Sequence, residues 1–112
     1  MIALEVRLNG KRICVAGAED LAVLTAMVTA SGPLGRKTVP VRSDEICDIY
    51  YRVGGLTGRC DESKDVHLTW RKFEPLGVGD SLQITILETR KADRPRSRHK
   101  RRKTKPLRRS PR

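Results

Sequence analysis

The chain has 112 residues, of which 33% are charged and 4% aromatic, and its formal net charge of +11 makes it strongly basic. This length fits one domain with a modest core, and no apolar run reaches the roughly 18 residues that a membrane-spanning helix needs. Because Glu5 and Arg7 interrupt the apolar N-terminus, we expect no signal peptide there. We expect a soluble, unexported protein in the cytoplasm, with a nuclear or nucleoid location as the alternatives.

The N-terminal residues predict a β-hairpin. Apolar and polar residues alternate over residues 2–8, which is the period of a half-buried strand. Asn9 and Gly10 follow, and this dipeptide is typical of a type I′ turn, in which both residues have positive φ. A second strand is therefore expected directly after Gly10.

A two-residue turn at this point also predicts the register of the hairpin. It places Val6 opposite Ile13, so that apolar side chains meet on one face. The same register places Arg7 opposite Arg12, a like-charge pair that costs stability unless solvent or a bound anion separates the two side chains.

Residues 18–31 predict a helix. The segment is rich in helix formers, has two acids where the first turn would lie, and precedes Gly32-Pro33, a helix stop. Its core stripe would consist of Leu21, Leu24 and Val28. A second helix face formed by Val23, Met27 and Ala30 is also uncharged, and we expect residues 34–44, a partner protein or a second copy of the chain to cover it.

Three further strands are predicted after a connection over residues 34–44. The first covers residues 45–53 and is expected to end at Gly54-Gly55. A weaker strand covers residues 66–73. A Gly79-Asp80 turn then leads into a final strand over residues 81–89.

This order of elements resembles the β-grasp family of ubiquitin and the sulfur-carrier proteins over residues 2–89. The resemblance rests on the opening hairpin and helix and on the "GD" turn before the last strand. It implies an α+β domain over residues 1–89, a mixed sheet with one helix packed on it. Sulfur carriers and ubiquitin-like modifiers end in Gly-Gly directly after the final strand, whereas here Gly54-Gly55 is internal, so their carrier or modifier chemistry is not implied.

No motif in the sequence predicts an enzyme or a cofactor site. There is no P-loop, GxGxxG or HExxH pattern. His67 follows Asp65 by two residues and could act as a general base, but a lone strand histidine is more often structural. Asp61, Glu62 and Asp65 could bind a hard cation, but without a regular ligand loop we interpret them as a solvated acidic loop.

The three cysteines favour a reducing compartment. Cys14, Cys47 and Cys60 form an odd set without a CxxC pair, which is a poor disulfide framework. Together with His67 they could form a tetrahedral zinc site. The alternative is that two of them are small apolar strand residues and Cys60 lies in a loop, and we expect no bound metal.

Residues 90–112 carry the excess positive charge. They contain 13 of the 24 Lys and Arg residues and one of the 13 acids, Asp93. Such a composition predicts a disordered tail that neutralises nucleic-acid phosphates. The expected phosphate contacts are Arg94, Arg96, Arg98, Lys100, Arg101, Arg102, Lys103, Lys105, Arg108 and Arg109. Because the tail has no aromatic residue to stack on bases, it should read the backbone of RNA or DNA.

Other functions of the tail remain open. It could dock on anionic lipid, although Leu107 is its only bulky apolar residue and we expect no membrane partner. It could be a nuclear localisation signal, or it could only confer solubility. The alternative function is a protein-interaction module whose sheet or second helix face binds a partner. If the folded domain recognises nucleic acid, the candidate residues are Arg7, Arg12, Arg52 and Arg71.

Overall fold

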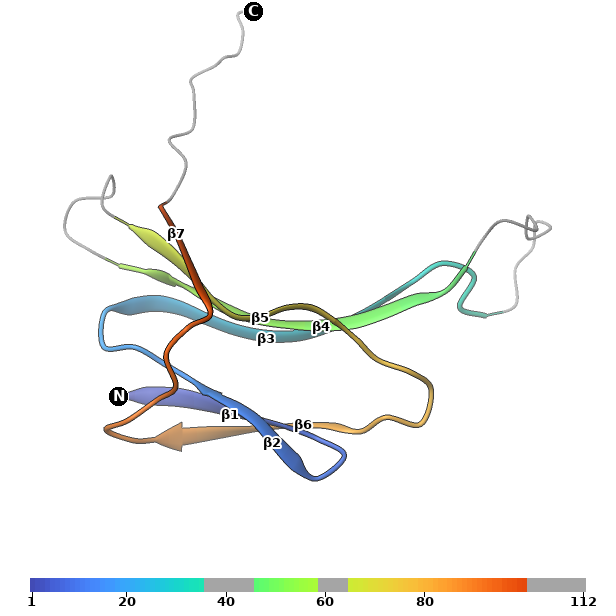
Figure 1. Ribbon diagram of the computed structural model, residues 1–112, viewed down its shortest axis with the longest axis horizontal. Helices are drawn as coiled ribbons and strands as arrows, with labels where there is room; N and C mark the ends of the chain where they lie inside the picture. The colour runs from blue at the N-terminus through green and yellow to red at the C-terminus, as the bar shows by residue number, and fades with distance from the viewer. Residues whose placement is uncertain (36–45, 59–64, 101–112) are drawn as a thin grey trace, which may run out of the picture.

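The computed structural model describes residues 1–35, 46–58 and 65–100, which form seven β-strands in two antiparallel sheets (Figure 1). The first sheet has the order β2-β1-β6, and the second has the order β3-β4-β5-β7. The strands of the first sheet are β1 (Ile2–Leu8), β2 (Lys11–Ala16) and β6 (Leu82–Glu88). Those of the second are β3 (Leu21–Ser31), β4 (Asp48–Thr57), β5 (Val66–Pro75) and β7 (Ser97–Lys100).

The predicted hairpin of β1 and β2 is present, with one change of register. Asn9 and Gly10 have φ values of 53° and 85°, as a type I′ turn requires. Arg7 pairs with Arg12 as expected, but the register then shifts and Val6 pairs with Cys14. Beyond the turn the predicted pairing is therefore off by one residue, because an irregularity in the ladder cannot be read from turn length.

The core lies between the two sheets. The first sheet contributes Val6, Cys14 and Ala16 to it, and the second contributes Tyr51, Val53, Leu68 and Trp70. All seven are buried, and Trp70, the largest, is fully so. The fold is thus a small two-layer β structure in which each sheet buries one face against the other.

The predicted helix over residues 18–31 is wrong, because this segment forms β3. Its Ala26 pairs with Val53 at the centre of β4, and the pairing continues over the length of the strand. The described residues contain no helix, so none in this part of the chain could cross a membrane. The expected α+β fold and the β-grasp architecture are therefore incorrect, since an all-strand structure of two antiparallel sheets takes their place.

β4 does not end at Gly54-Gly55 as expected but continues to Thr57. A Cβ atom on Gly55 would lie 2.6 Å from the carbonyl oxygen of Val23 on β3, so glycine permits the close approach of the two strands here. The Gly79-Asp80 turn before β6 is confirmed, with φ of 95° at Gly79 and a hydrogen bond from Asp80 N to Gly77 O.

Residues 90–100, assigned to a disordered tail from the sequence, belong to the ordered fold. Asp93 forms a parallel bridge with Ala16, and its carboxylate Oδ2 accepts the backbone N–H of Val15 at 2.8 Å. The chain then reaches the edge of β5, where β7 pairs with residues 66–69. Only residues 101–112 of the expected tail lie outside the described residues.

Candidate functional site

The outer face of the second sheet, which points away from the first sheet, carries the candidate site. Side chains alternate between the two faces of a strand. Because Tyr51 and Val53 point into the core, Arg52 and Gly54 point outward. Leu68 and Trp70 likewise lie in the core, which directs His67 and Thr69 to the same outer face.

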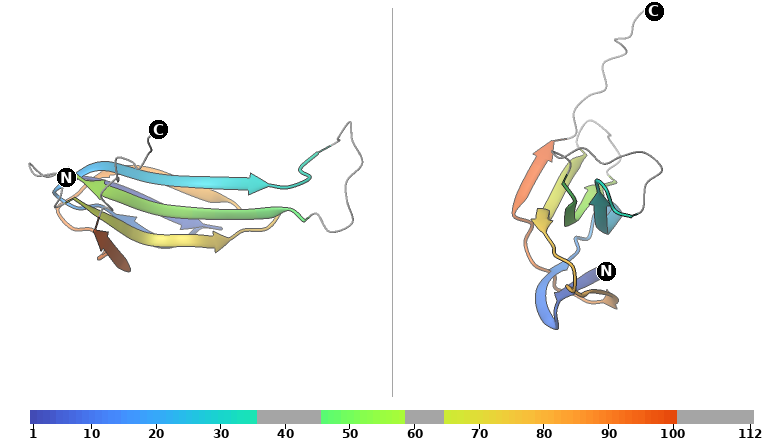
Figure 2. Two further views of the ribbon diagram at one scale, coloured as in Figure 1. Left: turned by 90° about the horizontal axis from the view of Figure 1, so that it is seen from above. Right: turned by 90° about the vertical axis from the view of Figure 1, so that its right-hand side faces the viewer.

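This outer face is hollowed into a groove of about 700 Å³, here called the outer groove. In Figure 1 the second sheet curves away from the first sheet at both ends, so that its outer face is concave, and Figure 2 shows β7 beside β5 along one side. Gly54 adds to the hollow because it has no side chain. The lining residues are Val23, Thr25, Met27, Arg52, Gly54, Gly55, Leu56, His67, Leu68, Thr69, Lys72, Ser97 and His99.

The strand pairing arranges most of these side chains in three rows across the sheet. The first is an imidazole row, in which Val23, Leu56, His67 and His99 follow one another from β3 to β7. The second is a hydroxyl row of Thr25, Gly54, Thr69 and Ser97. The third is a cationic row, in which Met27 pairs with Arg52 and Lys72 lines the groove from β5.

Arg52 of the cationic row contacts an aromatic side chain. The guanidinium carbon of Arg52 lies 5.5 Å from the centroid of the Phe73 ring, a cation–π arrangement. Phe73 in turn packs edge-on against Tyr50 at 5.2 Å between centroids. Phe73 has φ of 51°, and the β4–β5 register shifts between Tyr51 and Val53, so a local irregularity turns this aromatic toward Arg52.

The charge of the outer groove has one sign. Arg52 and Lys72 carry positive charge, His67 and His99 can donate hydrogen bonds through their ring nitrogens, and no described residue that lines the groove is acidic. Three hydroxyl side chains add further donors. This set of groups suits an anion that also has hydrogen-bonding and apolar parts.

The structure describes four of the ten predicted phosphate contacts. Arg96 donates its backbone N–H to Thr69 O at 2.7 Å, and its side chain forms an ion pair with Glu74 at 3.5 Å. Arg98 and Lys100 are exposed on β7 and alternate with the groove-lining Ser97 and His99, so they point to the opposite face. Arg94 is exposed before β7. Arg101, Arg102, Lys103, Lys105, Arg108 and Arg109 lie outside the described residues.

The three described residues of the considered zinc site do not come together. Cys14 is buried in the core, whereas His67 lies on the outer face of the second sheet. Cys47 is exposed and donates its thiol to Pro33 O at 3.2 Å, and Cys60 is not among the described residues. Burial raises the pKa of the Cys14 thiol, so this side chain is a poor nucleophile and a poor metal ligand.

His67, the considered general base, and the neighbouring acid Asp65 lie in different environments. Asp65 is buried, and its carboxylate accepts a hydrogen bond from Thr57 Oγ1 at 3.4 Å. His67 is exposed and faces the outer groove beside His99. Asp61 and Glu62, the other members of the considered cation site, lie outside the described residues.

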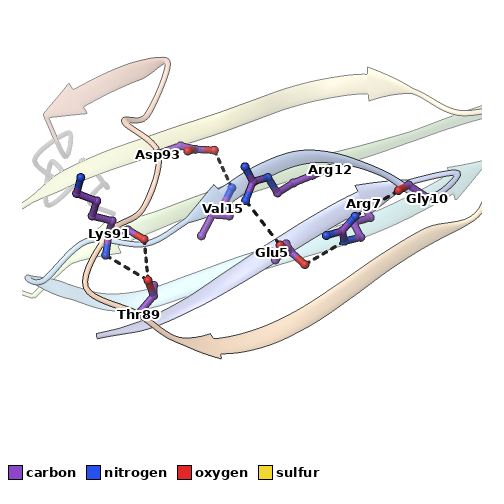
Figure 3. A network of polar contacts seen from close by, with 8 residues as sticks. All are labelled: Glu5, Arg7, Gly10, Arg12, Val15, Thr89, Lys91 and Asp93. Carbon is purple, nitrogen blue, oxygen red and sulfur yellow. Dashed lines mark hydrogen bonds and ion pairs between the residues drawn. The ribbon is translucent and has the colours of Figure 1, made fainter.

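The like-charge pair of Arg7 and Arg12 is resolved by a neighbouring carboxylate (Figure 3). Glu5 Oε1 accepts Arg7 Nε at 3.1 Å, and Glu5 Oε2 lies 4.0 Å from a guanidinium nitrogen of Arg12. The negative charge near the two arginines is therefore a side chain of the same hairpin, rather than the solvent or bound anion considered from the sequence. These two candidates for recognition by the folded domain are engaged, and Arg71 is too, since it donates to the carbonyls of Trp70 and Ile13.

Sequence reasoning named Arg52 but missed the outer groove. The imidazole row joins residues from β3, β4, β5 and β7, and its last member belongs to a segment expected to be disordered. The available signal was local: Arg52 and Gly54 alternate with buried residues in one strand.

No protein-family model, curated protein or solved structure matches this chain.

Proposed function

We propose that this chain is a non-catalytic accessory protein that binds RNA or DNA through the phosphate backbone. The observation that carries the proposal is the charge of residues 90–112, in which 13 basic residues face one acid. Basic side chains at this density neutralise phosphates and release condensed counterions, which favours binding whatever the base sequence.

The position of the single acid supports this proposal. Asp93 is the only carboxylate between Arg90 and the C-terminus, and it accepts the backbone N–H of Val15 (Figure 3). Its negative charge is thus held against the edge of β2. Among the described residues, no ion pair joins Asp93 to the exposed Arg98 or Lys100.

The attachment of the segment to the fold is a second support. β7 runs along β5 and ends at Lys100, so the basic residues 101–112 start from a defined edge of the second sheet. A contact residue held in a folded strand loses less freedom on binding than the same residue in a free peptide does. The exposed Lys100 at the end of β7 would therefore act together with the residues that follow it.

The test compares three lengths of chain on duplex DNA and on bulk RNA at one salt concentration. The full chain should bind both, and the chain that ends after Lys100 should bind both much more weakly. A chain that ends after Thr89 is unsuitable as the only comparison, because it also removes β7. Equal binding by the full chain and by the chain ending after Lys100 would contradict the proposal that the basic segment provides the contacts.

A protein-interaction module is the second candidate, and the surface of β6 favours it. Ile84 pairs with the buried Val6 and Ile86 pairs with Leu4, so both lie on the core-facing side of the first sheet. They are nevertheless 40% and 73% exposed. In this case Ile86→Lys should abolish binding of a protein partner, while removal of residues 101–112 should leave it unchanged.

A further inference from the structure

We infer that the outer groove binds a nucleoside phosphate, either free or as an unpaired nucleotide of a single strand. For the strand-borne ligand the inference rests on the proposed function and adds a site for the base. Residues 101–112 contain no aromatic side chain on which a base could stack, whereas the outer groove offers a surface of different chemistry. Its volume of about 700 Å³ lies within the range of small-molecule sites, roughly 300–1,000 Å³.

The order of the three rows matches the order of groups in a nucleotide. The cationic row provides Arg52 and Lys72 for a phosphate. The hydroxyl row next to it provides Thr25, Thr69 and Ser97 for the hydrogen-bonding groups of a sugar.

The imidazole row lies beyond the hydroxyl row and suits a base. His67 and His99 are directly opposite each other on β5 and β7, and Leu56 pairs with His67 from β4. Flat imidazole rings and an apolar side chain are groups on which a base can stack. At about 3.3 Å per residue, the four steps from Arg52 to Leu56 along β4 span about 13 Å, which can accommodate a phosphate, a sugar and a base in sequence.

The groove suits this ligand better than a simple anion or an apolar molecule. An inorganic anion would use the cationic row and leave the imidazole row without a role. An apolar ligand would bury Arg52, Lys72 and three hydroxyl groups without partners, which is costly. A duplex presents its bases stacked and paired, so only its phosphates could reach the groove.

The experiment measures fluorescence anisotropy of a labelled single strand, oligodeoxythymidine, and of a labelled duplex of equal length. Two groove variants are compared with the wild-type full chain. Thr69→Trp fills the hydroxyl row, and Arg52→Gln with Lys72→Gln removes both groove cations. Their matched controls are Gln83→Trp, on the outer face of the first sheet, and Lys11→Gln with Lys91→Gln, which removes two exposed charges outside the groove.

Both groove variants should weaken single-strand binding by about tenfold. Thr69→Trp fills the space between the rows and so prevents a base from stacking there, a contact of about this scale, and the double glutamine variant removes the cations proposed for the phosphate. For each groove variant, duplex binding should fall no further than in its matched control of the same charge. Gln83→Trp should change neither single-strand nor duplex binding. A groove variant that weakens both nucleic acids alike, or that leaves single-strand binding unchanged, would count against a strand-borne nucleotide. Each variant's thermal unfolding is recorded, and the cation variant decides if Thr69→Trp does not fold.

A titration with adenosine 5′-monophosphate, followed by amide NMR, separates the free nucleotide from the strand and from phosphate alone. Shifts at Thr25, Gly54, Thr69 and Ser97 that inorganic phosphate does not reproduce support a nucleoside phosphate site. The same shifts with inorganic phosphate alone would overturn it in favour of a simple anion site. The inference also fails if the monophosphate causes no such shifts and the groove variants do not discriminate single strand from duplex. If the wild-type chain binds neither nucleic acid, the proposed function is wrong. The monophosphate titration alone would then decide whether the outer groove binds a nucleoside phosphate.

Discussion

The indole nitrogen Nε1 of Trp70, in the centre of the core, donates a hydrogen bond to the backbone carbonyl oxygen of Asp93 at 2.7 Å. Asp93 belongs to the segment that composition assigns to a disordered tail. The bond therefore ties the start of that segment to the largest fully buried side chain of the second sheet. Residues 90–100 should contribute to stability, and the basic charge that follows them begins from an anchored strand.

The first prediction concerns this anchor. A chain that ends after Thr89 should unfold at a lower temperature than one that ends after Lys100, with a loss of about 2–4 kcal/mol, because the Trp70 donor is left buried without Asp93 and β5 loses its pairing with β7. Thermal denaturation of both chains measures the difference. Equal midpoints would show that residues 90–100 contribute nothing to the fold.

The second prediction concerns the turn between β1 and β2. Gly10 has φ of 85°, and a β-branched residue is strained in this region, so Gly10→Val should cost about 1–3 kcal/mol. The control is Gly77→Val, since Gly77 lies outside the left-handed region and an added Cβ would meet only Asp80 Oδ2, at 3.8 Å. Denaturant unfolding compares the two variants, and a larger loss for Gly77→Val would contradict the assigned turn.

The third prediction concerns Glu5, whose carboxylate lies between Arg7 and Arg12. Glu5→Gln should destabilise the chain by about 0.5–1.5 kcal/mol, because it leaves a cross-strand pair of like charges. Arg12→Gln in the Glu5→Gln background should recover part of this loss, and a double-mutant cycle measures the coupling. Added salt should narrow the gap between wild type and Glu5→Gln, and a gap independent of salt would argue against an electrostatic origin.

The fourth prediction concerns the pH dependence of stability at Asp80. A hydrogen bond from Gly77 N at 2.7 Å and a second from Asn9 Nδ2 at 3.0 Å lower the pKa of this carboxyl from its ordinary value of 3.8. A lowered pKa in the folded state means that the contribution of ionised Asp80 to folding stability is present above pH 3.8 and is lost as the pH falls through the folded-state pKa. Asp80→Asn should thus be less stable than wild type at neutral pH, and the gap in melting temperature should close at acidic pH. A difference in melting temperature that widens on acidification would contradict a lowered pKa of Asp80 in the folded state.

The fifth prediction concerns the salt dependence of nucleic-acid binding. If about half of the 13 basic residues contact phosphates at once, log affinity for duplex DNA should fall against log salt with a slope of about −5. Replacing Lys100, Arg101, Arg102 and Lys103 together by glutamine should flatten the slope by about four at most. Duplexes of scrambled sequence and equal length should bind within a few-fold of one another. A slope near zero would exclude the phosphate mechanism.

The sequence by itself determined the features that depend on neighbouring residues. The Asn9-Gly10 and Gly79-Asp80 turns are present because the positive φ of Asn9, Gly10 and Gly79 is a conformation that these residue types adopt locally. The alternation in residues 2–8 likewise indicated β1, and it placed Val6 correctly in the core. The charge of the C-terminal segment is also a property of composition, and no tertiary contact alters it.

Tertiary structure decided the features that depend on pairing between distant residues. Residues 21–31 are apolar on both faces. The helix interpretation left Val23 and Met27 uncovered, whereas in β3 both line the outer groove while Leu24 and Ala26 pack against the core. Pairing with β4 stabilises the strand rather than the helix here, because tertiary pairing overrides weak local propensity. The edge of β5 similarly ordered residues 97–100, although their composition predicts disorder. The outer groove requires both the formation of β3 and the pairing of β7 with β5, since its rows exist only when β3 and β7 lie at opposite edges of one sheet.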